Sequence, residues 1–200
     1  MGVVFCRNGQ LYIISNDGIL RNMVDLPDNT EIPGINFQNI TLSHLPNISK
    51  LKVTDDIRII GGNLESLDGC PQFVSGHVFI RGNKLTSLHG APKQVGKSFH
   101  CDSNKLTSLE GAPSIINGDF SCENNKLLNL IGGPTEVIGD FICRQNQLTS
   151  LEGAPRKVGR NFWCTDNKIK SLRGAPEEIG GFFSFNAKNL ESLDGLPKAK

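Results

Sequence analysis

The sequence lacks any run of about 18 apolar residues, so it predicts no membrane-spanning helix. It also lacks an excess of charge of either sign: 21 Lys and Arg residues face 20 Asp and Glu residues, which leaves a formal net charge of +1. This balance provides no overall field that would draw the chain to nucleic acid or to an anionic membrane. The start, MGVVFCRNGQ, lacks the charged and apolar regions of a secretory signal, so a cytoplasmic location is expected.

What the sequence does contain is a repeat. A leucine-class residue recurs every 21 residues, at Leu64, Leu85, Leu106, Leu127, Leu148, Ile169 and Leu190. A second Leu follows each of these residues by three positions, then Gly two positions later and Pro two positions after that. The whole unit reads N-x-L-x-S-L-x-G-x-P-x-x-V-(x-G)-x-F-x-C-x-x, and seven copies in register are beyond chance.

The repeat predicts a solenoid. A unit of this size cannot bury its apolar side chains alone, so neighbouring units must stack to form a continuous core. The Phe-x-Cys segment alternates with a period of two, which predicts a short strand whose Phe and Cys point inward. The Gly-x-Pro segment opposes helix formation. The predicted fold is therefore a β-rich solenoid with one short parallel strand per 21-residue unit and little α-helix.

The N-terminal part of the chain is expected to close one end of this solenoid. The apolar runs VVFC and LYII flank Asn8-Gly9, and Asn-Gly between apolar runs is a strong hairpin signal. Residues 1–42 are therefore predicted to form a β-hairpin cap with a degenerate first unit, and residues 43–200 one continuous solenoid. Because a Phe-rich strand near residues 182–185 lies within one unit of Lys200, we expect that the last residues fold back or that this edge pairs in a homodimer.

The strand and the turn after it resemble a known family. The pattern F-x-C-x-x-N-x-L, with Phe141, Cys143, Asn146 and Leu148 as one instance, resembles the leucine-rich-repeat core L-x-L-x-x-N-x-L. The motif NxLTSL resembles the short repeats of bacterial effector proteins and repeats encoded by many tailed phages. The resemblance covers roughly residues 43–197. It implies an interaction protein that sequesters or inhibits a host protein, such as a defence component, in the host cytoplasm if the chain is phage-encoded.

The repeat also decides how the cysteines and histidines are interpreted. One repeat position holds Cys101, Cys122, Cys143 and Cys164, and other units have Ile59, Ile80 and Phe185 there. A position that accepts Ile is a core position, so we expect no metal site, no disulfide and no cofactor. His100 and Cys101 are successive strand residues that face opposite sides, which argues against a catalytic pair.

Two charged rows support alternative functions. Asp119 and Asp140 share one outward position on adjacent units, and Asp102 and Glu123 form a second such pair. Strands about 4.8 Å apart would bring these carboxylates near the separation used by retaining glycosidases, so an enzyme acting on a glycan or polyanion is one alternative. Binding of nucleic acid along a lysine row is another, although a solvated edge is the favoured interpretation of Lys84, Lys105, Lys126 and Lys168.

The outward strand positions vary from unit to unit while the scaffold positions do not, and such variation is typical of a recognition surface. We therefore predict a non-enzymatic module that binds a protein partner through this face. The predicted centre is Ile142, Trp163 and Phe182, with carboxylates that steer basic residues of the partner. The predicted partner-binding residues are Phe79, His100, Asp102, Asp119, Glu123, Asp140, Ile142, Arg144, Trp163 and Phe182.

Overall fold

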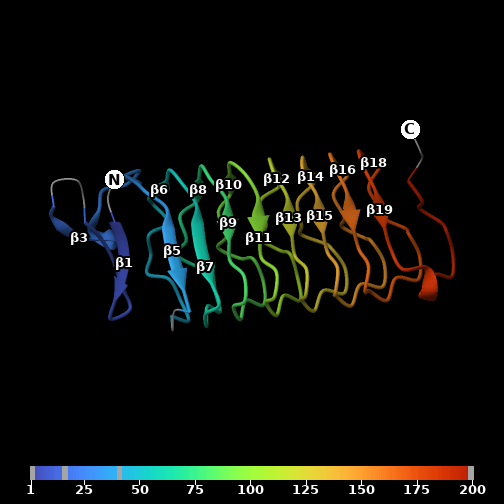
Figure 1. Cartoon of the computed structure of the whole chain (residues 1–200), viewed down its shortest axis with the longest axis horizontal. Coiled ribbons are helices and arrows are strands. Elements are labelled where there is room, and N and C mark those ends of the chain that lie inside the picture. Colours follow the sequence, from blue (N-terminus) through green and yellow to red (C-terminus); the bar gives the residue numbers. More distant parts are fainter. Residues whose placement is uncertain (1–2, 15–17, 40–41, 198–200) are drawn as a thin grey trace.

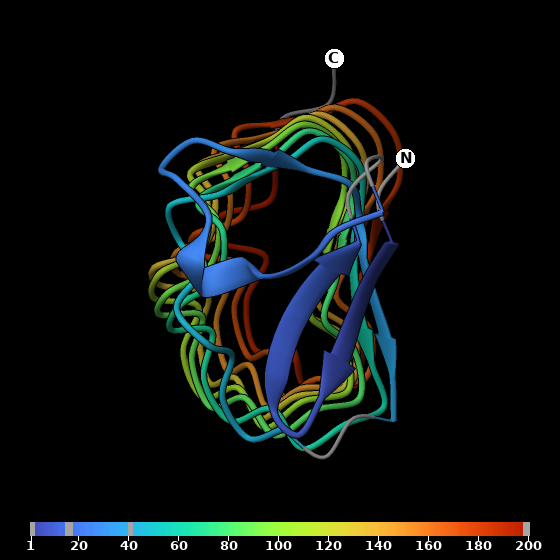
Figure 2. The same ribbon diagram turned by 90° about the vertical axis from the view of Figure 1, so that its left-hand side faces the viewer.

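The computed structural model describes residues 3–14, 18–39 and 42–197 and shows a β-solenoid of about seven turns (Figure 1). An antiparallel sheet of three strands lies at its N-terminal end, in the order β1 (Val3–Arg7), β2 (Gln10–Ile14) and β3 (Leu20–Asn22). The predicted hairpin turn is confirmed, since Asn8 and Gly9 join β1 to β2 with φ of 51° and 75°. Figure 2 shows this sheet across the end of the coil, where Leu11 and Ile13 join the core.

One wall of the solenoid is a continuous parallel sheet of eight strands, which we call the first wall. Its strands are β5 (Ile35–Gln38), β7 (Ile57–Ile60), β9 (Val78–Phe79), β11 (Phe99–His100), β13 (Phe120–Ser121), β15 (Phe141–Ile142), β17 (Phe162–Trp163) and β19 (Phe183–Ser184). From β9 to β19, equivalent residues pair at a spacing of 21, as in Phe99 with Phe120. The parallel strands predicted from Phe-x-Cys are confirmed.

A second wall, for which the sequence predicted no strands, carries another two-residue strand in each turn. It consists of two four-stranded sheets, β4 (Glu31–Ile32), β6 (Lys52–Val53), β8 (Phe73–Val74) and β10 (Gln94–Val95), then β12 (Ile115–Ile116), β14 (Glu136–Val137), β16 (Lys157–Val158) and β18 (Glu178–Ile179). The other elements are the 3₁₀ turns η1 (Met23–Asp25) and η2 (Ala187–Asn189). The described part of the chain contains no α-helix, and hence none long and apolar enough to cross a membrane.

The core between the walls follows the repeat. Phe99, Phe120, Phe141 and Phe162 are fully buried, and successive rings stack with centroids 5.8, 5.4 and 5.1 Å apart. The four cysteines of the repeat are buried, as predicted for a core position. At the C-terminal end Leu193 is 61% exposed, whereas its equivalent Leu172 is fully buried. Pairing of this end with a second copy stays a prediction.

A ladder of five asparagines closes the turns that follow strands β9 to β17 of the first wall. The Asn125 carboxamide oxygen accepts the Leu106 N–H at 2.9 Å, while its Nδ2 donates to the Cys101 and Cys122 carbonyls at 3.2 and 3.0 Å. Equivalent bonds are made by Asn83, Asn104, Asn146 and Asn167. The ladder satisfies backbone groups that lie inside the coil where no strand can pair them.

Candidate functional site

The structure brings all ten predicted binding residues to the outer face of the first wall. Three rows of side chains run along this face, parallel to the solenoid axis. The middle row, from the strands themselves, is Asn36, Arg58, Phe79, His100, Ser121, Ile142, Trp163 and Ser184. The leading row, two residues earlier, is Asp56, His77, Ser98, Asp119, Asp140, Asn161 and Phe182. The trailing row, two residues later, is Ile60, Arg81, Asp102, Glu123, Arg144, Thr165 and Asn186.

The leading row is a ladder of hydrogen-bond acceptors. The Asp56 Oδ1 accepts the His77 N–H at 2.7 Å, and each later side chain up to Asn161 accepts the backbone N–H of its equivalent one turn on. The acceptors are His77 Nδ1, Ser98 Oγ, Asp119 Oδ1, Asp140 Oδ1 and Asn161 Oδ1. The residue types differ, but all can accept a hydrogen bond, so the variation in this row is limited by the backbone it supports. The sequence alone does not reveal this role.

The carboxylates of Asp119 and Asp140 are therefore engaged in hydrogen bonds within the solenoid, which a catalytic pair would have to maintain during the reaction. Asp140 Oδ1 accepts both the N–H and the Nδ2 of Asn161 at 3.0 Å, and Asp140 Oδ2 accepts the indole N–H of Trp163 at 3.3 Å. Asp119 Oδ1 accepts the Asp140 N–H at 2.8 Å. This arrangement does not favour the paired-carboxylate enzyme hypothesis.

The N-terminal part of the face is an arginine–aromatic stack. The guanidinium carbon of Arg58 lies 4.4 Å from the Phe79 ring centroid, and that ring stacks on His77 and His100 with centroids 5.4 and 4.9 Å apart. Arg58 also donates to Asp56 Oδ2 at 2.7 Å. Burial would raise the pKa of Asp56, but the His77 N–H and the Arg58 guanidinium outweigh it and hold the pKa below its usual value. The stack is thus fixed by a carboxylate at its base.

His100 is uncharged at neutral pH. Burial, followed by the positive charge of Arg81, lowers its pKa to about 4, although the Asp119 carboxylate acts in the opposite direction. The nearest approach of His100 Nδ1 to Asp102 Oδ1, 3.9 Å, is therefore no ion pair at neutral pH. The imidazole is therefore a neutral ring that is partly exposed and stacks on Phe79.

This pKa predicts a pH dependence of folding. Below pH 6.5 the unfolded chain takes up a proton at His100 that the folded chain does not bind until about pH 4, so the free energy of unfolding falls as the pH drops through this window. In a His100→Phe variant, which retains a ring beside Phe79, we expect a smaller loss between about pH 7 and pH 5. Urea unfolding of both proteins at the two pH values measures this. An equal loss in both would contradict a lowered pKa.

Two ion pairs lie along the trailing row, each between residues of adjacent turns. Arg81 Nη1 lies 3.8 Å from Asp102 Oδ2, and Arg144 Nη2 donates to Glu123 Oε2 at 3.0 Å. Burial and, less strongly, the neighbouring Glu123 raise the pKa of Asp102, although Arg81 counteracts them. Asp102 Oδ1 and Arg144 Nε are buried without a hydrogen-bond partner among the described residues. The middle of the face is therefore polar, and some of its hydrogen-bonding groups have no partner within the described part of the chain.

The C-terminal part of the face is apolar and partly held in place. Ile142 and Trp163 are half-buried, whereas the sequence suggested exposed side chains, because each lies in a dense row and Asp140 holds the Trp163 indole. Phe182, at the last position of the leading row, is 75% exposed. The predicted centre thus combines two half-buried apolar side chains with one exposed ring.

The inward residues beside this face offer no reactive group. Burial raises the pKa of Cys101 well above its usual value, and the thiol lies on the other side of the strand from the His100 ring. Within the described ranges there is no group of three or more His, Cys, Asp or Glu side chains that could hold a metal ion.

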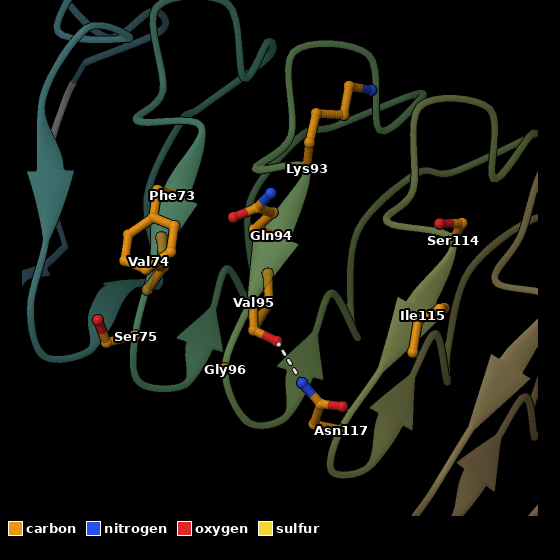
Figure 3. Close-up of a pocket in the computed structure, with 10 residues that line it drawn as sticks. All are labelled: Phe73, Val74, Ser75, Lys93, Gln94, Val95, Gly96, Ser114, Ile115 and Asn117. Carbon is orange, nitrogen blue, oxygen red and sulfur yellow. Dashed lines mark hydrogen bonds between the residues drawn. The ribbon is translucent and has the colours of Figure 1, made fainter. Parts of the chain in front are cut away.

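The second wall has a hollow that the sequence does not predict. No backbone pairing joins β10 to β12, although the first wall continues through the same turns. A groove of about 700 Å³ lies at this break (Figure 3). Gln94 lies between Phe73 and Ile115, and Lys93 lies at one end of the groove. One turn earlier, the Gly96 N–H donates to the Val74 carbonyl. At the break, the equivalent residue Asn117 instead contacts the Val95 carbonyl through its side-chain Nδ2, at 3.5 Å. A two-residue break of this kind leaves no periodic signal in the sequence.

Comparison of the chain with protein-family models, with curated proteins and with solved structures finds no match.

Proposed function

We propose that the chain is a non-enzymatic β-solenoid module that binds a protein partner through the outer face of the first wall. The observation that carries this proposal is the set of half-buried apolar and aromatic side chains that are held in fixed positions along one continuous sheet. Aromatic rings and arginine, anchored before binding, lose little conformational entropy in an interface. The Arg58–Phe79–His100 stack and the Asp140-held Trp163 both have this character.

The partner class follows from the resemblance to leucine-rich repeats of bacterial effectors and phage-encoded proteins. On that basis the partner is a bacterial host protein, which the chain sequesters or inhibits in the host cytoplasm. The carboxylates Asp102, Asp119, Glu123 and Asp140 favour a partner with basic side chains opposite the middle of the face.

A pull-down from bacterial lysate with matched variants tests the proposal. Trp163→Ala/Ile142→Asp alters the first wall, and Phe73→Ala/Ile115→Asp makes similar changes on the second wall, where both side chains are exposed. A protein retained by the wild type and the second-wall variant, but lost from the first-wall variant of verified fold, is the expected result. Equal capture by all three proteins, or loss only from the second-wall variant, would refute binding through the first wall.

A further inference from the structure

The three aspartates of the leading row differ in how their second oxygen is used. In Asp56, Asp119 and Asp140 alike, Oδ1 accepts the backbone N–H of the next turn. Asp56 Oδ2 also accepts the Arg58 guanidinium at 2.7 Å, and Asp140 Oδ2 accepts the Trp163 indole N–H at 3.3 Å. The second oxygen of an aspartate in this row therefore takes an N–H donor from a middle-row side chain, of the same turn in one case and of the next turn in the other.

Asp119 is the aspartate that receives no such donor. The middle-row residue of its own turn is Ser121, which is 3% exposed and short, and that of the next turn is Ile142, which has no polar group. The Asp119 side chain is partly exposed, and among the described residues no hydrogen bond or ion pair reaches its Oδ2. An aspartate that is already fixed through Oδ1 thus presents one free acceptor to a partner.

The side chains around this acceptor suit a planar cation. The neutral His100 ring belongs to the preceding turn and the Ile142 side chain to the following one. Four carboxylates, of Asp102, Asp119, Glu123 and Asp140, face two guanidinium groups, of Arg81 and Arg144, over these turns. The surplus of negative charge makes the region complementary to a positive group.

We propose that Asp119 Oδ2 binds an arginine side chain of the partner protein, with its guanidinium beside the His100 ring and Ile142. This inference rests on the proposed function and specifies the chemistry of the partner. The chain itself shows the arrangement once: Arg58 donates to Asp56 Oδ2 while its guanidinium lies over the Phe79 ring. Arginine fits better than lysine because its planar group can stack on a ring and donate to a carboxylate at the same time.

The test uses Nα-acetylarginine amide as the probe and the neutral isostere Nα-acetylcitrulline amide as its control. Chemical shifts of the His100, Ser121 and Ile142 signals are followed by NMR as each probe is added. We expect arginine to shift them about threefold more per unit concentration than citrulline, since an exposed ion pair supports discrimination of this size. Equal shifts from the two probes would overturn the proposal.

Variants locate the response. Asp119→Asn retains an Oδ1 that can accept the Asp140 N–H, as Asn161 does for Phe182, but it removes the charge. We expect its arginine response to fall to the citrulline level, while Asp68→Asn, at an exposed site elsewhere, leaves it unchanged. In Ile142→Trp an indole N–H can fill Asp119 Oδ2 as Trp163 fills Asp140 Oδ2, so this variant should also lose the response. An undiminished response in Asp119→Asn overturns the assignment.

The NMR test and the pull-down can fail separately. If a captured partner depends on Trp163 and Ile142 but arginine gives no specific shift, the arginine site is wrong and the first-wall interface stands. If the specific shift is present and no first-wall-dependent partner is captured, the site is supported as an arginine acceptor and the protein-binding function loses its support.

Discussion

Replacing Phe141 by alanine is expected to lower the free energy of unfolding by about 3–5 kcal/mol. The side chain is fully buried, and its ring stacks between Phe120 and Phe162 with centroids 5.4 and 5.1 Å away. In a solenoid each turn contacts only its neighbours, so no distant element can move in to fill the cavity. The lost ring also separates the two halves of the aromatic stack, which should weaken the coupling between them.

Urea unfolding followed by circular dichroism measures this effect, and Phe182→Ala is its matched control. Phe182 is 75% exposed, so its removal should change the free energy of unfolding by no more than about 0.5 kcal/mol. A separation of the Phe141→Ala transition into two steps would agree with decoupled halves. Equal, small effects of both substitutions would mean that the stacked phenylalanines do not form the core.

The second large effect is expected for Asn125→Leu, which keeps a side chain of similar size and removes its polar groups. The Leu106 N–H would lose its acceptor. The carbonyls of Cys101 and Cys122 would each lose one donor but would still accept from Asn104 and Asn146. A buried polar group without a partner costs about 1–3 kcal/mol, so the unpaired Leu106 N–H should destabilise the chain by about that amount.

The exposed Lys126, one residue further on, provides the comparison for Asn125. Lys126→Leu adds a similar apolar side chain to the same turn without removing a described hydrogen bond, so its effect should stay within about 0.5 kcal/mol. Thermal and urea unfolding of both variants distinguish the two cases. If Asn125→Leu is as stable as the wild type, the asparagine ladder does not have the structural role described above.

The sequence predicts those parts of the fold that depend on residue identity. Phe141 and Cys143 alternate around an outward Ile142, and this period of two is sufficient to place the first-wall strand and its inward side chains. The 21-residue recurrence fixes the register, since equivalent residues must pair from turn to turn. The Asn8-Gly9 turn is equally local, because its positive φ values favour these two residue types.

Features that depend on hydrogen bonding between turns leave a weaker signal. The leading-row ladder is built from Asp, His, Ser and Asn, which share only the capacity to accept an N–H, so the sequence suggested free variation there. The second-wall strands contain one inward apolar residue each, such as Val137, too short a pattern to identify. The break between β10 and β12 depends on how two turns pack, which no single repeat position encodes.

Similar reasons apply to the candidate site. The sequence places the ten predicted residues on one face, because the strand period alone decides which side chains point outward. It does not predict that Asp140 holds the Trp163 indole or that Arg58 lies over Phe79, since these contacts join residues of adjacent rows and turns through their side-chain conformations. These contacts distinguish side chains that are fixed before binding from those that are merely exposed.

The most direct test of the account is the affinity of the purified captured partner for the wild-type chain and the two matched variants, measured by titration calorimetry. Truncation of a hot-spot residue costs about 2 kcal/mol or more, so Trp163→Ala/Ile142→Asp should weaken binding about 30-fold or more, while Phe73→Ala/Ile115→Asp leaves it unchanged. Unchanged affinity in the first-wall variant, with a loss in the second-wall variant, would contradict the proposal and place the interface at the groove of the second wall.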